Sequence, residues 1–240
     1  MAAHNERRLL NFAYLCIKHL EIVMNIDRLI DKYFKGESSR IAIEVFDDTS
    51  IYHVYSDIVK MLNDYPEIEL TVLQAMAYCF YEVLDNVLTH SEKRVGTVLT
   101  LFDEKNTKVK ILVVDDGIGI NKSLSCNPKY FGISETEALR LCLQDSVTDG
   151  KGMGYGLYSI MQLIRNAGSI LIIHSGNSLL TYDGKEIKVS SVDFWQGTIV
   201  YFELHSNKVI DPHQVLEGRA DVESGYDQLF DADDNLDNLW

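Results

Sequence analysis

The sequence reads V-V-D-D-G-I-G-I from Val113 to Ile120 and D-G-K-G-M-G-Y-G-L from Asp149 to Leu157. In the second segment, glycines alternate with other residues at Gly150, Gly152, Gly154 and Gly156. Glycine loses more backbone freedom on folding than any other residue, so such a run indicates close approach of the backbone to something. The apolar residues that follow recur at helical spacing, so the glycines lie at a helix N-terminus (Leu157, Ile160, Met161, Leu163 and Ile164). Unpaired N–H groups and the positive end of the helix dipole make that place a natural phosphate site.

Composition narrows the class of protein. The chain has 240 residues, 46% of them hydrophobic, which is enough to bury a sizeable core. The formal net charge of -14 argues against nucleic acid or an anionic membrane as the main partner. No apolar run reaches the length of a membrane span, and the N-terminus lacks the core of a signal peptide. We therefore expect a cytoplasmic protein with no membrane partner.

Apolar periodicity predicts the order of the elements. The strongest helical pattern covers residues 69–89, and the strand-like runs 97–102 and 108–114 form a hairpin signal. Further elements are expected as helices over 6–35 (one or two), 50–62, 134–143 and 155–166, and strands over 41–46, 170–174, 186–192 and 198–204, with turns at 175–177 and 183–184. Helices on one face of a mostly antiparallel sheet give an α+β two-layer sandwich.

Three regions follow from this pattern. Residues 1–68 are expected to be a helical N-terminal extension, which either forms a partner or dimer surface or covers the sheet. Residues 69–207 form the main domain. Residues 208–240 are an acidic tail that is expected to be disordered, with a docking peptide for a protein partner as the alternative.

Two polar side chains interrupt the apolar pattern of the helix over 69–89. Glu82 and Asn86 are four residues apart, so they lie on one face of the helix. A carboxylate and an amide beside a core are costly unless something satisfies them, and a nucleotide with its metal would do so. Their oxygens suit Mg²⁺, and a carboxylate can deprotonate a water molecule. The simpler alternative is a solvated helix edge.

Asp115 ends a strand that reads as buried and is followed by Asp-Gly-Ile-Gly. A carboxylate at this place can accept a hydrogen bond from a flat ligand that lies against the backbone. The alternative is an ordinary turn after a strand, because Asp and Gly are common turn residues.

Four motifs in order resemble those of the GHKL superfamily of ATP-binding domains. This superfamily includes type II topoisomerase ATPase subunits, ninety-kilodalton heat-shock chaperones, sensor histidine kinases and mismatch-repair ATPases. E-V-L-D-N-V-L-T-H-S (Glu82 to Ser91) looks like the N box, and D-D-G-I-G and G-K-G-M-G-Y-G-L look like the two glycine boxes. Q-G-T-I-V-Y-F-E-L (Gln196 to Leu204) resembles the strand that closes the domain. The resemblance implies the Bergerat-type ATP-binding fold.

The resemblance also implies roles for matching residues. Asp115 would accept the adenine amino group, with Thr198 assisting through water. Asn86 would hold the Mg²⁺ that bridges the phosphates of ATP. Glu82 would be the base that activates water or a substrate group.

The glycine boxes would contact the remainder of the nucleotide. Gly117 and Gly119 would allow close approach of the adenine end. The residues that would wrap the phosphates are Gly152, Gly154 and Gly156, next to a lid over about residues 121–152. Lys151 is placed to meet a phosphate, and a solvated lysine is the alternative.

Differences between this sequence and members of the family that it resembles indicate which reaction ATP binding serves. The histidines before Glu82 are His4, His19 and His53, and none lies in the H-[ED]-x-x-[NT] context of a phosphoacceptor. Autophosphorylation in cis is therefore disfavoured. A near-minimal domain of this size resembles the anti-sigma-factor serine kinases. The leading interpretation is an ATP- and Mg²⁺-dependent regulatory protein that hydrolyses ATP or phosphorylates a protein partner. The alternatives are a non-catalytic ATP-dependent switch and a scaffold that binds no nucleotide.

Overall fold

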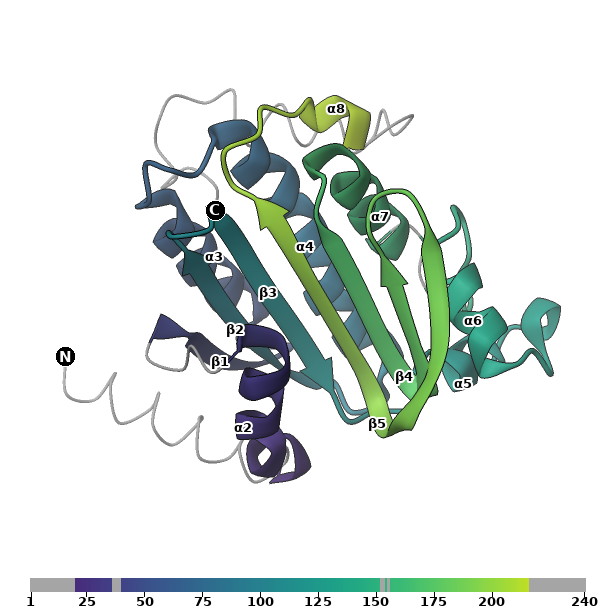
Figure 1. Ribbon diagram of the computed structural model, residues 1–240. Helices are drawn as coiled ribbons and strands as arrows, with labels where there is room; N and C mark the ends of the chain where they lie inside the picture. The colour runs from purple at the N-terminus through teal and green to yellow at the C-terminus, as the bar shows by residue number, and fades with distance from the viewer. Residues whose placement is uncertain (1–19, 36–39, 152–153, 155, 216–240) are drawn as a thin grey trace.

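A five-stranded antiparallel sheet organises the residues that the computed structural model describes, which are 20–35, 40–151, 154 and 156–215 (Figure 1). The strand order is β1-β2-β3-β5-β4, so β3 lies in the middle between β2 and β5. The elements are α2 (Leu20–Phe34), β1 (Ala42–Asp47), α3 (Ile51–Asn63), α4 (Leu70–His90), β2 (Val95–Asp103), β3 (Lys108–Asp115), α5 (Ile120–Leu124), η2 (Pro128–Tyr130), α6 (Glu135–Leu141), α7 (Gly156–Ala167), β4 (Ile170–Tyr182), β5 (Ile187–His205) and α8 (Pro212–Val215). The predicted α+β class and antiparallel sheet are confirmed.

The main core lies between one face of the sheet and α3, α4 and α7. The wide apolar stripe of α4 supplies much of it, because residues at helical spacing along this helix are buried (Val72, Leu73, Met76, Ala77, Phe80, Val83, Leu84, Val87 and Leu88). The strands contribute alternate residues, among them Val98, Ile111, Val113 and Phe202. Full burial of each large apolar side chain contributes about 1.5–3 kcal/mol, so this layer holds α4 rigidly against the sheet.

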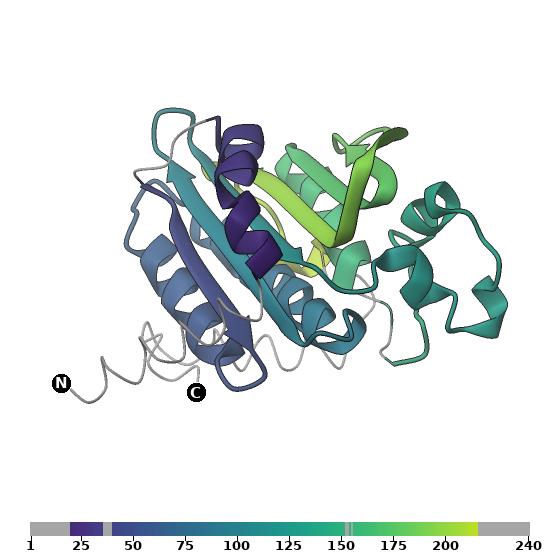
Figure 2. The same ribbon diagram turned by 90° about the horizontal axis from the view of Figure 1, so that it is seen from below.

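Helix α2 covers the opposite face of the sheet. Figure 2 shows α2, in purple, on the side away from the blue helices α3 and α4. Its buried side chains Leu29, Ile30, Tyr33 and Phe34 form a second core with Leu99, Leu101, Leu112, Val114, Ile199 and Tyr201. The ring centroids of Tyr33 and Tyr201 lie 4.9 Å apart. Helices were predicted on one face of the sheet only, but one helix covers the other face. Residues 6–19 of the predicted N-terminal helical region lie outside the described residues.

The sheet begins before residue 69, where the sequence pattern placed the start of the main domain. Strand β1 pairs with β2 over its whole length, from Ala42 with Thr100 to Asp47 with Val95. Helix α3 packs on α4, and its buried residues belong to the main core. Much of the predicted N-terminal extension is thus an edge strand and a helix of the same domain.

The last part of the sheet is one long hairpin rather than three strands. The predicted strands 186–192 and 198–204 are continuous in β5, and the turn predicted at 175–177 is wrong. At Gly176, whose φ is 61°, the ladder shifts register instead of ending. A bulge bends a ribbon without breaking it, and the hairpin turns sharply at this corner (Figures 1 and 2). The turn predicted at 183–184 is confirmed, since it joins β4 to β5.

Two other segments are more ordered than the sequence pattern indicates. Before the helix predicted over 134–143, which is observed as α6, the segment predicted as a lid contains the short helices α5 and η2. In the predicted tail, Ile210 and Val215 are buried and α8 contacts α4 and α7. Residues 216–240 lie outside the described residues. Within the described part of the chain, no helix is both long and apolar enough to cross a membrane.

Candidate nucleotide-binding site

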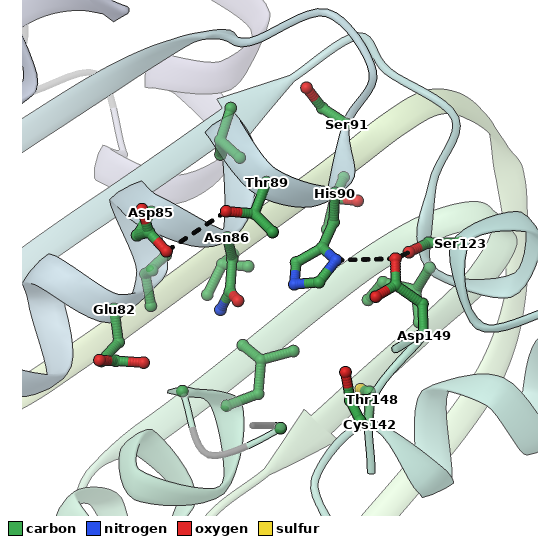
Figure 3. Close-up of a pocket in the computed structure, with 18 of the residues that line it drawn as sticks. Glu82, Asp85, Asn86, Thr89, His90, Ser91, Ser123, Cys142, Thr148 and Asp149 are labelled. Carbon is green, nitrogen blue, oxygen red and sulfur yellow. Dashed lines mark hydrogen bonds and ion pairs between the residues drawn. The ribbon is translucent and has the colours of Figure 1, made fainter. Parts of the chain in front are cut away.

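A cavity of about 400 Å³ opens between α4, the end of β3, the middle of β5, and the segment that leads from α5 to α7 (Figure 3). Most of the predicted site residues line this cavity: Glu82, Asn86, Asp115, Gly119, Lys151, Gly154, Gly156 and Thr198. They come from four separate stretches of sequence, and the fold brings them together. Gly152 lies outside the described residues, and Gly117 is not among the lining residues.

One face of α4 supplies the polar side of the cavity. Glu82, Asn86 and His90 recur every four residues, and Figure 3 shows them along the same side of the helix. The N-terminus of α7 packs directly on this face at Gly156. A Cβ atom at Gly156 would lie 2.7 Å from Asn86 Nδ2 and 3.3 Å from Glu82 Oε2, so a larger residue there would displace the side chains of Asn86 and Glu82. The predicted base and metal ligand thus face the first turn of a helix, where phosphate is favoured.

Asp115 lines the cavity from the end of β3. It is 4% exposed, and its Oδ1 accepts a hydrogen bond of 2.8 Å from the backbone N–H of Gly117. Thr198 also donates to the carboxylate, through its hydroxyl and its backbone N–H. Burial raises the pKa of Asp115 to about 7, and the neighbouring charge of Asp116 adds to this effect, while the donated hydrogen bonds oppose it. Asp115 therefore changes its protonation state near neutral pH.

This titration predicts that adenosine binding strengthens as pH rises toward 8. Below a pKa of about 7, binding to the ionised acceptor must first remove a proton, so affinity should fall by up to about tenfold per pH unit. Titration calorimetry with adenosine between pH 5.5 and 8.5 measures the profile, because adenosine carries no phosphate that titrates in this range. The same midpoint in His90→Asn would exclude His90 as the titrating group. A pH-independent affinity of the wild type would contradict the assignment.

The loop after Asp115 is held by the corner of the β4–β5 hairpin. The indole N–H of Trp195 donates to the Asp115 carbonyl at 3.2 Å, and the Gln196 amide donates to the Gly117 carbonyl. The Ser175 hydroxyl donates to the Gly197 carbonyl at 2.9 Å. The sequence pattern missed Trp195 and Ser175, and it used Gln196 only as part of a strand motif. The contacts of Trp195 and Gln196 span about 80 positions and that of Ser175 spans 22, so no local pattern points to them.

Close packing against the end of α4, rather than the cavity, explains why residue 117 is a glycine. A Cβ atom there would collide with the backbone of Ser91 at the end of α4. The backbone N–H of Ile118 donates to the Ser91 carbonyl at 3.1 Å. The close packing therefore locks the first glycine motif onto the end of the helix that carries Glu82 and Asn86.

Asp149, just before the glycine run, is a further residue that sequence reasoning left without a role. Its Oδ2 lies 2.8 Å from His90 Nδ1 and accepts a hydrogen bond of 2.8 Å from the Ser123 hydroxyl, as the dashed lines of Figure 3 show. Its Oδ1 accepts one of 2.9 Å from the backbone N–H of Lys151. Burial alone would raise the pKa of Asp149, but these donors hold that pKa below its usual range. The carboxylate is thus charged at neutral pH.

The described residues contain no group of three or more His, Cys, Asp or Glu side chains that could hold a metal ion. A magnesium ion at this place would therefore depend on the oxygens of the nucleotide, on water and on one or two side chains, as is usual for Mg²⁺. The Asn86 amide and the Glu82 carboxylate, both partly exposed to the cavity, fit that requirement.

Comparison with known proteins identifies the class. The family described as "Histidine kinase-, DNA gyrase B-, and HSP90-like ATPase" matches residues 71–208, which is more than half of the chain. The chain belongs to this family of ATP-binding domains. No match is found among curated proteins.

Proposed function

We propose that this protein is an ATP- and Mg²⁺-dependent regulatory protein that hydrolyses ATP or transfers its terminal phosphoryl group to a protein partner. One observation carries the proposal: Glu82 and Asn86 face the N-terminus of α7 in the cavity that also contains Asp115. In this proposal the cavity contains a group that can bind adenine, Asp115, and groups that can bind the phosphates with their metal, at Asn86 and the start of α7. The match to the ATPase family supports nucleotide binding independently.

The chain's own residues have separate tasks in this proposal. Asp115 accepts the adenine amino group, and the backbone N–H groups at the start of α7 donate to phosphate oxygens. Asn86 and the phosphate oxygens hold Mg²⁺, which supplies charge stabilisation when bound. Glu82 takes the proton of the attacking water or hydroxyl group. Catalysis then rests on positioning and electrostatics rather than on a covalent intermediate.

The ATP-bound protein would act on a protein partner or on a second copy of the chain. The small size of the domain resembles that of anti-sigma-factor serine kinases, in which the ATP-loaded domain is itself the regulator. The net charge of -14 supports a partner other than nucleic acid.

A non-catalytic ATP-dependent switch is the second candidate. The segment between Gly119 and Gly154 lines the cavity through Ser123 and Asp149, and it also carries Phe131, whose side chain is 83% exposed. A nucleotide that reorganised this segment would change the surface around an exposed aromatic side chain. Binding alone would then give the signal.

Titration calorimetry with a non-hydrolysable ATP analogue tests the binding part of the proposal. We expect saturable binding with Mg²⁺, and affinity lower by about tenfold or more in EDTA, because the phosphates then lack their counter-ion. A GTP analogue should bind at least about tenfold more weakly, since guanine has a carbonyl where adenine donates to Asp115. No binding of any nucleotide to demonstrably folded protein would reject the proposal.

A further inference from the structure

We propose that Asp149 is a positioning residue that fastens both ends of the segment over residues 121–151 to α4, and so sets the affinity for the phosphates of ATP but not for adenosine. This inference rests on the proposed function, because it assigns a task within the same site. Asp149 acts in this inference by positioning other residues, and it is assigned no contact with the nucleotide.

The contacts of Asp149 come from three different parts of the chain. His90 is the last residue of α4, Ser123 lies near the start of the segment, and Lys151 lies near its end. All three donate to one carboxylate at 2.8–2.9 Å. The carboxylate is therefore the only point in this network that touches the start of the segment, its end and the helix with Glu82.

Burial makes the network cooperative. The Asp149 side chain is 1% exposed, and a charged carboxylate at such a place is tolerated only when its oxygens are satisfied by donors. Removing its charge weakens all three contacts together, because charge-assisted hydrogen bonds are roughly twice as strong as neutral ones. The Asn127 amide, which donates to the Thr148 carbonyl at 3.0 Å, also joins two parts of the segment, but it does not reach α4.

Loss of the Asp149 contacts should affect the predicted phosphate end of the cavity and not the adenine end. Asp149 leads directly into Lys151, Gly154 and Gly156, the described residues at the predicted phosphate end. The adenine end has its own supports, since Trp195 and Gln196 hold the backbone at Asp115 and Gly117. A loose segment should therefore misplace the phosphate donors while Asp115 stays in position.

The experiment compares two ligands on Asp149→Asn. Affinity for the Mg²⁺ complex of a non-hydrolysable ATP analogue should fall about tenfold, whereas affinity for adenosine, measured by competition, should change by less than about twofold. Asp103→Asn is the matched control, because Asp103 is also a buried carboxylate with several donors, Lys110 and Asn106, but does not line the cavity. Asp103→Asn should lower thermal stability without separating the two affinities.

A second pair of variants tests the mechanism through His90. His90→Asn keeps a donor near the place of Nδ1 and should retain most of the affinity for the ATP analogue, whereas His90→Leu should resemble Asp149→Asn. The inference would be overturned if Asp149→Asn lost affinity for both ligands equally, or for neither. Binding of the ATP analogue to the wild type would still support the proposed function in that case. No binding of either ligand to the folded wild type would overturn both.

Discussion

Asp115→Asn should lower the affinity for a non-hydrolysable ATP analogue by roughly a hundredfold, which corresponds to about 3 kcal/mol. The groups around this carboxylate are donors: the Gly117 N–H, the Thr198 hydroxyl and the Thr198 N–H. The adenine amino group would be one more. An asparagine side chain has a single acceptor atom, so its NH₂ group would have to face a donor whichever way the amide turns. Titration calorimetry on both proteins measures the difference.

The control for this variant is Asp183→Asn at the turn of the hairpin. Asp183 accepts the backbone N–H groups of Lys185 and Glu186 and lies outside the cavity, so its replacement should leave nucleotide affinity within about twofold. Circular dichroism must show that both variants are folded. Unchanged affinity in Asp115→Asn would mean that the adenine assignment is wrong.

Glu82→Gln should abolish turnover while sparing binding. If Glu82 is the general base, its loss should lower the rate of phosphate release or transfer by about 10²–10⁴-fold, with nucleotide affinity changed by less than about threefold. The neutral amide has nearly the same size, so the close packing of Gly156 on Glu82 is kept. Release of inorganic phosphate from labelled ATP measures hydrolysis, and label on a partner protein measures transfer.

Asp85→Asn is the matched control on the same helix. Asp85 is an exposed carboxylate that lines the same cavity, and its Oδ2 accepts a long hydrogen bond of 3.4 Å from the Thr89 hydroxyl. We expect it to retain turnover within about threefold of the wild type. Full turnover in Glu82→Gln would contradict the catalytic role, and no turnover in a wild type that binds ATP would favour the non-catalytic switch.

Features that depend on local pattern were accessible from the sequence. The helix predicted over 69–89 is observed as Leu70–His90, because its apolar residues keep helical spacing over five turns. The hairpin of β2 and β3 follows from two alternating runs and a polar turn. The local motifs also predicted residues that the structure gathers around one cavity, such as Glu82 and Asp115.

Features that depend on distant contacts were not accessible. No role was predicted for Asp149 from the sequence, because its partners His90 and Ser123 lie 59 and 26 residues away. The helical pattern of α2 shows that it has an apolar face but not which side of the sheet that face covers. The merged strand β5 was missed because a glycine at a bulge looks the same in sequence as a glycine at a turn.

The hairpin corner also bears on the order in which the chain folds during synthesis. Asp115 emerges from the ribosome long before its strand partner Thr198 and before Trp195, which lies 80 positions further along. Until β5 is made, the middle strand β3 has a neighbour on one side only, and the backbone after Asp115 lacks its two side-chain donors. Such non-local pairing is slow to form because a long loop must close first. We therefore expect the part of the cavity around Asp115 to be completed only after Thr198 has been synthesised, so a shorter chain should lack the predicted adenine contact.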